Sequence, residues 1–299
     1  MNPVVTQCEF RGNGLTLAAD RWDPPSDATR GAGDASKGVV LLLHGGGQTR
    51  YSWRHTGARL AADGWTTYAL DARGHGESQW APDGDYGIDA LVADLTCVID
   101  TLDEQPVLVG ASMGGMTSLI GQGENPDLAR AVVLVDIAPK VETAGTAQIG
   151  AFMRSGLDGF ASLDDAAAAI AAYTPHRVRT PNPDGLRKNL RLRDGRWYWH
   201  WDPAFLRDGD EPTRQTDSTL RYERARAAAA AITVPTMLVR GAQSNVVSAD
   251  GVKELLELIP TATVIDVAGA GHMVAGDDND VFSGGLKDFL DDHVATRHR

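Results

Sequence analysis

The chain has 299 residues, 42% hydrophobic and 23% charged, a composition typical of a globular protein whose core needs no disulfide or metal to hold it. Its 28 Lys and Arg against 40 Asp and Glu give a net charge of −12, which argues against general electrostatic binding to nucleic acid or anionic lipid. Two cysteines, Cys8 and Cys97, form no disulfide framework or zinc cluster, and no apolar run reaches the ~18 residues of a membrane span.

The N-terminal part of the chain predicts a hairpin followed by a buried strand. Its first residues, MNPVVTQCEF, show neither the basic nor the apolar segment of an export signal, so we expect a soluble, cytoplasmic protein. Residues 4–10 and 15–22 have the pattern of two strands joined by a turn at Gly12-Asn13-Gly14. The run VVLLL at 39–43 is continuously apolar, as in a strand buried on both faces of a parallel sheet.

Helices and strands then alternate up to about residue 139. A helix is expected to end at Gly64, followed by a strand at 65–70 and a helix over 88–103. The strand VLVGA (107–111), a further helix and the strand AVVLVDIA (131–138) come next. This alternation predicts an α/β protein whose parallel strands are joined by right-handed crossovers.

An insert between residues 140 and 230 interrupts the alternation. It holds an alanine-rich helix (164–173) and the aromatic run RWYWHWDP (196–203), and we interpret it as a helical lid over the C-terminal edge of the sheet. Strand TMLVRG, a helix, strand TVIDVAG and a last helix near 279–292 follow. We therefore expect one domain, with a core of residues 1–139 and 231–299 and a lid of residues 140–230.

The motif VLVGASMGG (107–115) carries the strongest chemical signal. Gly110-x-Ser112-x-Gly114 follows an apolar strand and precedes a helix, which is the context of a nucleophile elbow. The serine sits on a tight, strained turn there, and side chains at the glycine positions would collide with the neighbouring strand and helix. The alternative is a glycine-bounded turn with an ordinary surface serine.

With this motif the chain resembles the α/β-hydrolases, and among them the single-domain serine esterases and the cofactor-free bacterial haloperoxidases (perhydrolases). The resemblance covers nearly the whole chain and is least specific in the insert. It implies the α/β-hydrolase fold, with a mostly parallel eight-stranded sheet flanked by helices and a helical lid.

Two glycine-containing loops match the family. In LLLHGGGQ (41–48), the loop after the strand would supply one oxyanion-hole N–H, and the residue after the nucleophile would supply the second. By position these are Gly46, or Gly47 if the loop is shifted, and Met113. In LDARGHGES (70–78), we expect His75 to be a structural hydrogen-bonding residue.

A serine hydroxyl needs a neutral imidazole to take its proton, and a carboxylate usually orients that imidazole, so a triad needs a histidine and an acid besides Ser112. His272 follows strand TVIDVAG in the family's G-x-G-H context. The family's usual acid position holds Ser244 and Asn245, neither of them a carboxylate. Some relatives, including haloalkane dehalogenases, place the acid after the next strand, where this chain has Asp136, 24 residues beyond Ser112. Asp250 and a dyad without an acid are the alternatives.

These residues predict a serine hydrolase that cleaves a carboxylic ester, lactone or thioester through an acyl-enzyme on Ser112, with His272 as base and Asp136 as orienting acid. No metal or organic cofactor is expected, because His and Cys lack ligand spacing and the glycine loops lack a P-loop lysine. A C–C bond hydrolase or lyase on the same triad, and a non-catalytic ligand-binding protein, are the alternatives. Epoxide hydrolases and dehalogenases are disfavoured because they use a carboxylate nucleophile.

Substrate choice is expected to lie in the lid. Trp199 and Trp201, together with Trp53 soon after the HGGG loop, are predicted to line a hydrophobic pocket, although aromatic residues of a lid often form only its own core. The expected partner is a small apolar ester, with no nucleic acid and no membrane, and the oligomeric state stays open between a monomer and a homodimer.

Overall fold

The structure, a computed structural model, describes residues 4–25, 36–173, 183–206, 211–268, 270–271 and 280–294. Eight strands form one sheet in the order β1-β2-β4-β3-β5-β6-β9-β10. The hairpin β1–β2 is antiparallel and pairs antiparallel with β4, while all other neighbours are parallel. This confirms the predicted α/β-hydrolase architecture with a mostly parallel sheet. The strands are β1 Val5–Arg11, β2 Thr16–Trp22, β3 Val39–Leu43, β4 Thr66–Leu70, β5 Val107–Ala111, β6 Ala131–Val135, β9 Thr236–Gly241 and β10 Thr263–Val267.

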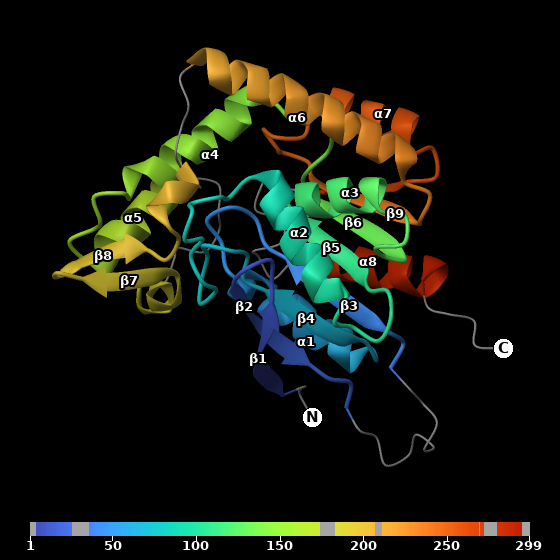
Figure 1. Ribbon diagram of the computed structural model, residues 1–299, viewed down its shortest axis with the longest axis horizontal. Coiled ribbons are helices and arrows are strands. Elements are labelled where there is room, and N and C mark those ends of the chain that lie inside the picture. Colours follow the sequence, from blue (N-terminus) through green and yellow to red (C-terminus); the bar gives the residue numbers. More distant parts are fainter. Residues whose placement is uncertain are drawn as a thin grey trace.

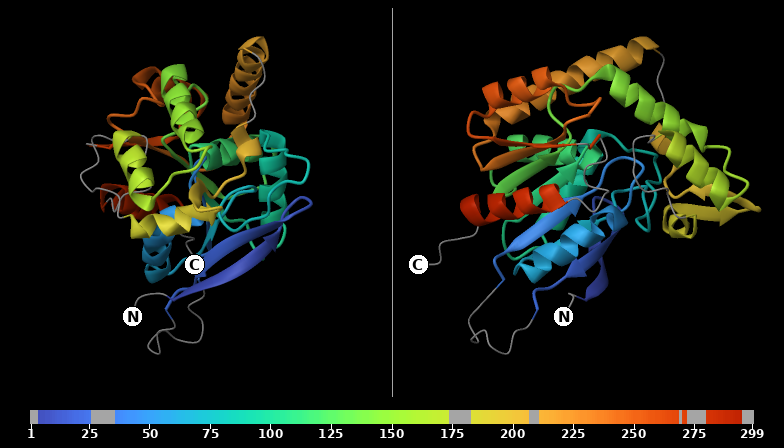
Figure 2. Two further views of the ribbon diagram at one scale, coloured as in Figure 1. Left: turned by 90° about the vertical axis from the view of Figure 1, so that its left-hand side faces the viewer. Right: turned by 180° about the vertical axis from the view of Figure 1, so that it is seen from behind.

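Helices cover both faces of the sheet (Figures 1 and 2). Alternate strand residues point to opposite layers: Val109 packs in the layer of α1 and α8, and Leu108 in the layer of α2. Both side chains are fully buried, which explains why the central strands read as unbroken apolar runs. The helices of the core are α1 Arg54–Ala62, which follows the short helix η1 Arg50–Trp53, and α2 Ile88–Ile99, α3 Met113–Glu124, α7 Ala249–Leu258 and α8 Asp280–His293.

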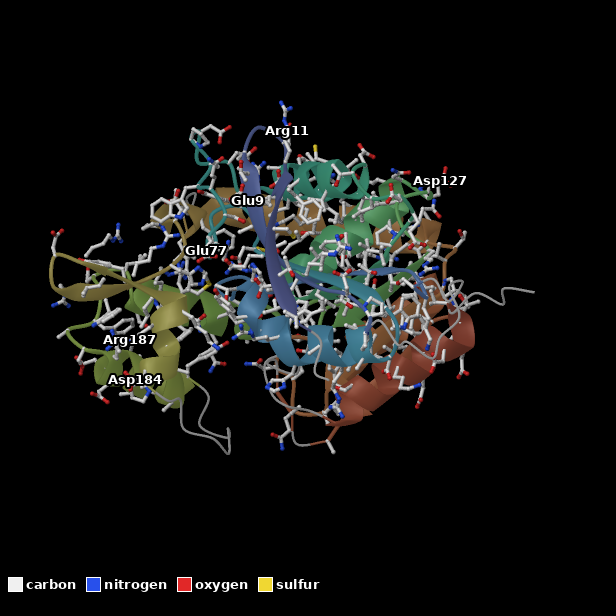
Figure 3. All side chains as sticks on the ribbon, turned by 90° about the horizontal axis from the view of Figure 1, so that it is seen from below. Glu9, Arg11, Glu77, Asp127, Asp184 and Arg187 are labelled. Atoms are coloured by element: carbon white, nitrogen blue, oxygen red, sulfur yellow. The ribbon has the colours of Figure 1, made fainter. Side chains whose placement is uncertain are left out.

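The insert projects from one end of the sheet and is only partly helical (Figure 1). The aromatic run, predicted as part of a helical lid, instead forms strand β8 of a small hairpin with β7. The lid has its own core, in which Met153, Trp199 and Trp201 are buried. Figure 3 shows Asp184 and Arg187 on its outer side, where they form an exposed ion pair of 3.5 Å. Its elements are α4 Thr143–Ser155, α5 Leu163–Tyr173, η2 Asp184–Asn189, β7 Leu190–Arg193, β8 Arg196–Trp199 and η3 Pro203–Leu206.

Helix α6 (Glu211–Ala231) links the lid to the core, and the predicted lid boundary at residue 230 falls near its end. Its C-terminal half packs against α3, where Ala225 and Ala229 are fully buried beside Leu119. The two helices approach closely at Gly123, where a Cβ atom would overlap the backbone of Ala228. Among the helices of the described ranges, none is long and apolar enough to cross a membrane.

Candidate active site

Ser112 occupies a strained turn between β5 and α3. Its backbone has φ 46° and ψ −109°, a conformation that residues other than glycine rarely adopt. Hydrogen bonds fix the turn on both sides. The Ser112 N–H donates to the Val135 carbonyl at 3.1 Å, and the Ser112 carbonyl accepts from the Met116 N–H at 2.8 Å. The serine is thereby held at the C-terminal edge of the sheet and at the start of a helix, where the helix dipole favours negative charge.

The flanking glycines let three backbones meet at this turn. A Cβ atom on Gly114 would lie 2.5 Å from the carbonyl oxygen of Leu43, at the end of β3. A Cβ atom on Gly110 would overlap the backbone of Gly114, and one on Gly115 would overlap Ile137. Real Cβ atoms do not approach so closely, so the elbow requires glycine at all three positions.

The HGGG loop lies directly beside the nucleophile. A Cβ atom on Gly45 would be 3.4 Å from the Cβ of Ser112. The Gly45 N–H donates to Gln48 Oε1 at 3.0 Å, and the Gly47 N–H donates to His75 Nε2 at 3.1 Å. Within the described part of the chain, the N–H groups of Gly46 and Met113 have no hydrogen-bond acceptor. These two donors are the predicted oxyanion pair, whereas the N–H of the alternative residue, Gly47, is already engaged.

Asp136 follows the strand next to that of the nucleophile. Ala111 and Val135 are register partners, so Ser112 and Asp136 leave the sheet side by side. Asp136 is fully buried and also has a positive φ, 50°. Its Oδ1 accepts from the Gly241 N–H at 3.0 Å, and its Oδ2 accepts from the Ser244 hydroxyl at 2.6 Å. The carboxylate is therefore fixed in orientation at the edge that holds Ser112.

The family's usual acid position, 244, and the alternative position, Asp136, lie next to each other in the structure. Ser244, which stands where the family usually has its acid, is hydrogen-bonded to Asp136. Asp250 lies elsewhere: its side chain is 81% exposed, in the first turn of α7, and 3.9 Å from the Lys140 ammonium group. The geometry thus favours Asp136 over Asp250, although the acid's role itself stays a prediction.

His272, the predicted base, lies outside the described residues. The residue before it, Gly271, is described and lies against the end of β9, because a Cβ atom on Gly241 would overlap the Gly271 carbonyl oxygen. Gly241 is the residue whose N–H donates to Asp136. The chain therefore reaches position 271 close to the proposed acid, and the role of His272 stays a prediction.

The three predicted substrate-binding tryptophans are all buried. Trp53 lies in the core near Phe282, with ring centroids 6.1 Å apart, and its buried indole Nε1 has no hydrogen-bond partner among the described residues, so its role in substrate binding stays a prediction. Trp199 and Trp201 stack in the lid core with centroids 5.0 Å apart. Trp201 is the one that reaches the HGGG loop, since its Cζ3 atom would be 3.3 Å from a Cβ atom on Gly47.

Other lid residues also reach this loop. The Phe205 ring would be 3.4 Å from a Cβ atom on Gly46, and Met153 would be 3.2 Å from one on Gly47. His200 is buried and bonds the Gly47 carbonyl, a contact that the sequence did not suggest. These residues stand more than 100 positions from the HGGG loop along the chain, so no local pattern could have joined them to it.

Histidines beside the site are buried and neutral. Burial, and then the neighbouring His44, lower the pKa of His75 to about 3, and burial lowers the pKa of His44 to about 4. His75 accepts from Gly47 at Nε2, so its Nδ1–H donates to the Arg73 carbonyl at 3.0 Å. With both ring nitrogens engaged, His75 has the structural role expected from the sequence.

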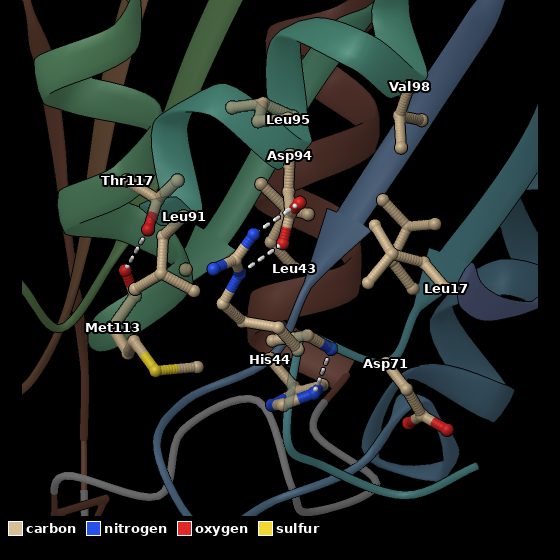
Figure 4. Close-up of a pocket in the computed structure, with 14 residues that line it drawn as sticks. Leu17, Leu43, His44, Asp71, Leu91, Asp94, Leu95, Val98, Met113 and Thr117 are labelled. Carbon is tan, nitrogen blue, oxygen red and sulfur yellow. Dashed lines mark hydrogen bonds and ion pairs between the residues drawn. The ribbon is translucent and has the colours of Figure 1, made fainter. Parts of the chain in front are cut away.

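A cavity of about 40 Å³ lies behind the elbow (Figure 4). Met113 and Thr117 of α3, Leu95 of α2 and the ion pair of Arg73 with Asp94 line it, with Arg73 Nε 2.6 Å from Asp94 Oδ2. It is large enough only for water molecules, so it is not a substrate pocket. No group of three or more His, Cys, Asp or Glu side chains placed to hold a metal ion is found among the described residues.

Comparisons with known proteins agree with the observed fold. A family model described as the alpha/beta hydrolase fold matches residues 38–278. An sn-1-specific diacylglycerol lipase of Mus musculus is 29% identical over 303 residues, which cover 96% of this chain and 91% of the relative. An esterase of Mycobacterium tuberculosis is 30% identical over 239 residues, covering 76% of this chain and 73% of the esterase. The crystal structure of E-2-(acetamidomethylene)succinate hydrolase, 24% identical, has a TM-score of 0.78 over 96% of this chain and 100% of that chain.

Proposed function

Because the chain belongs to the α/β-hydrolase fold family, we propose that it is a serine hydrolase that cleaves a carboxylic ester, a lactone or a thioester through an acyl-enzyme on Ser112. One observation carries the proposal. Ser112 is held in a strained elbow against Gly45 of the HGGG loop, and the N–H groups of Gly46 and Met113, the residues that follow Gly45 and Ser112, have no acceptor in the described part of the chain. Preorganised, unpaired donors next to a nucleophile are what a developing oxyanion requires.

The proposed reaction has two steps. The Ser112 hydroxyl attacks the carbonyl carbon while His272 takes its proton, and the N–H groups of Gly46 and Met113 hold the oxyanion. His272 then gives the proton to the leaving alcohol or thiol, which departs and leaves the acyl group on Ser112. Water, activated by His272, releases the acid by the same route. Each oxyanion donor is expected to contribute roughly 10²–10³ in rate.

Asp136 is the proposed orienting acid. A carboxylate can accept about four hydrogen bonds, and those from Gly241 and Ser244 are two of them, so these two bonds are compatible with a further one from an imidazole N–H. A buried, fixed carboxylate holds the histidine in the tautomer that presents its other nitrogen to the serine. No organic cofactor or metal enters these steps.

Two of the relatives, a diacylglycerol lipase and an esterase, act on esters according to their names, which supports an ester substrate. The third, E-2-(acetamidomethylene)succinate hydrolase, leaves the substrate class open. A C–C bond hydrolase or lyase on the same residues is the second enzymatic reading, and ligand binding without turnover is the non-catalytic one. The sequence resemblance to cofactor-free haloperoxidases is not singled out by these relatives. Perhydrolysis and the cytoplasmic location stay predictions, and the oligomeric state stays open between a monomer and a homodimer.

A covalent probe tests the nucleophile. Treatment with a fluorophosphonate is expected to add one phosphonyl group to the peptide that carries Ser112, seen by intact mass and peptide mapping, and Ser112→Ala is expected to abolish the adduct. The same preparation is then assayed on an aryl acetate, a β-diketone and a cyanohydrin. Labelling together with turnover of the acetate alone supports the ester hydrolase. Turnover of the β-diketone or cyanohydrin favours the second reading, and an unlabelled Ser112 without turnover favours the non-catalytic one.

A further inference from the structure

Two histidines from different parts of the chain hold Gly47 of the HGGG loop. The Gly47 N–H donates to Nε2 of His75, which lies in the loop after β4. The Gly47 carbonyl oxygen lies 3.3 Å from Nε2 of His200, which lies in the lid directly after β8. The His75 and His200 rings are neighbours, with centroids 5.8 Å apart.

The tautomer of His200 follows from its second contact. Its Nδ1 accepts a hydrogen bond from the Gly76 N–H at 2.7 Å, so the ring proton is on Nε2 and is donated to Gly47. Only 2% of this side chain is exposed. Burial, and then the neighbouring His75, lower the pKa of His200, which keeps the ring neutral and the donor in place.

The bonds to Gly47 matter because the loop has little stiffness of its own. Three consecutive glycines populate many backbone conformations, and Gly47 itself has φ 76°. On the N-terminal side of Gly46, the Gly45 carbonyl accepts from the Gln48 N–H at 3.0 Å. On its C-terminal side, His75 and His200 hold the N–H and the carbonyl of Gly47. Gly46 is thus fixed from both sides with its own N–H unpaired.

We propose that His200 is a positioning residue for the oxyanion hole, through which the lid holds the HGGG loop, packed against Ser112 at Gly45, in the conformation that leaves the Gly46 N–H unpaired. This inference rests on the proposed function. The lid side chains Met153 and Trp201, which pack on Gly47, hold the same residue by contact. Because the oxyanion forms only as the carbonyl is attacked and is absent from the bound substrate, loss of this support lowers kcat more than it changes KM.

Two substitutions separate the two hydrogen bonds of His200. The amide nitrogen of His200→Gln reaches the place of Nε2 and keeps the donor to Gly47. The amide oxygen of His200→Asn reaches the place of Nδ1 and keeps only the acceptor for Gly76. With an aryl acetate, we expect kcat of the Asn variant to fall roughly 10- to 100-fold, less than the loss of an oxyanion donor itself, with KM within about threefold of the wild type. The Gln variant is expected to recover most of kcat.

A second measurement reads the loop without turnover. Amide hydrogen exchange at Gly47 and Gln48, whose N–H groups are hydrogen-bonded in the native loop, is followed by NMR and is expected to be faster in His200→Asn than in the wild type and His200→Gln. His55→Asn, an exposed histidine on α1, is the matched control, and thermal melts show that each variant is folded. Equal kcat and equal exchange in the Asn and Gln variants would overturn the inference, as would a change confined to KM. Failure of the proposed function shows differently, as an unlabelled and inactive wild type, and the exchange comparison then decides the role of His200.

Discussion

Three residues other than glycine have a positive φ among those that the structure describes, and two of them, Ser112 and Asp136, end adjacent strands at the same edge of the sheet. The third, Asp194, precedes Gly195 in the tight turn of the lid hairpin, where positive φ is ordinary. A left-handed backbone costs about 1–3 kcal/mol and persists where the surroundings hold it. The strain at Ser112 and Asp136 therefore coincides with the side chains proposed to do chemistry.

Moving the acid tests the assignment of Asp136. We expect Asp136→Asn to lower kcat on an aryl ester by about 10⁴, because the histidine loses its orienting carboxylate. Adding Ser244→Asp to that variant is expected to restore part of the loss, since the Ser244 hydroxyl lies 2.6 Å from Oδ2 of Asp136. Asp250→Asn, at an exposed position, is the control and is expected to change kcat less than about twofold. A folded Asp136→Asn enzyme with wild-type kcat would refute the assignment.

At the scale of elements, Arg50 joins β2, the loop after β4 and the start of η1. Its Nε donates to Asp20 at 2.9 Å, and its terminal nitrogens contact Asp71 and Glu77. Burial alone would lower the pKa of the Arg50 guanidinium, but Asp71, together with Asp20 and Glu77, raises it. Because Arg50 lies only three residues after Gly47, this cluster holds the chain just beyond the C-terminal end of the HGGG loop.

Removing this guanidinium is expected to be costly. Arg50→Ala leaves Asp20 and Asp71 buried without their cation, so we expect the free energy of unfolding to fall by about 3–5 kcal/mol. Urea denaturation measures the change. Arg21→Ala, which breaks an exposed pair with Asp23, is the matched control and is expected to cost less than about 1 kcal/mol. Similar small losses in both variants would show that the cluster does not stabilise the fold.

The core elements could be predicted because their patterns are local. VVLLL and VLVGA are unbroken apolar runs, and they form β3 and β5. The helix predicted over 88–103 ends at Ile99, because the apolar pattern continues into the turn that follows it. The lid was harder. Its hairpin has a local signal, Asp194-Gly195 between two alternating runs, that is typical of a two-residue turn. The contact of His200 with Gly47 joins residues 153 positions apart and has no sequence pattern.

At the scale of the whole molecule, the interface between core and lid holds three buried neutral histidines, His44, His75 and His200. Each has a pKa below the ordinary value of 6.5. As the pH falls below about 6.5, the unfolded chain binds protons at these histidines and the native protein does not, so the free energy of unfolding falls. The contribution is complete above pH 6.5 and is lost as the pH falls through about 4.

The pH dependence of stability provides the test. We expect the free energy of unfolding to fall between pH 6.5 and 4.5, with His200→Gln falling less steeply, by up to about 1.4 kcal/mol per pH unit, because one titrating group is gone. Urea melts across this pH range measure both slopes. Parallel curves for wild type and His200→Gln would show that His200 titrates normally in the native protein.

The position of helix α6 has a consequence for how the protein unfolds. It begins in the lid and ends against α3, and its last turns fill the core around Ala225 and Ala229. If the lid unfolded together with this helix, the apolar side of α3 at Leu119 and Ile120, which is fully buried in the native state, would be exposed to water. We therefore expect lid and core to unfold as one cooperative unit, and we expect that exchanging the lid would require rebuilding α6.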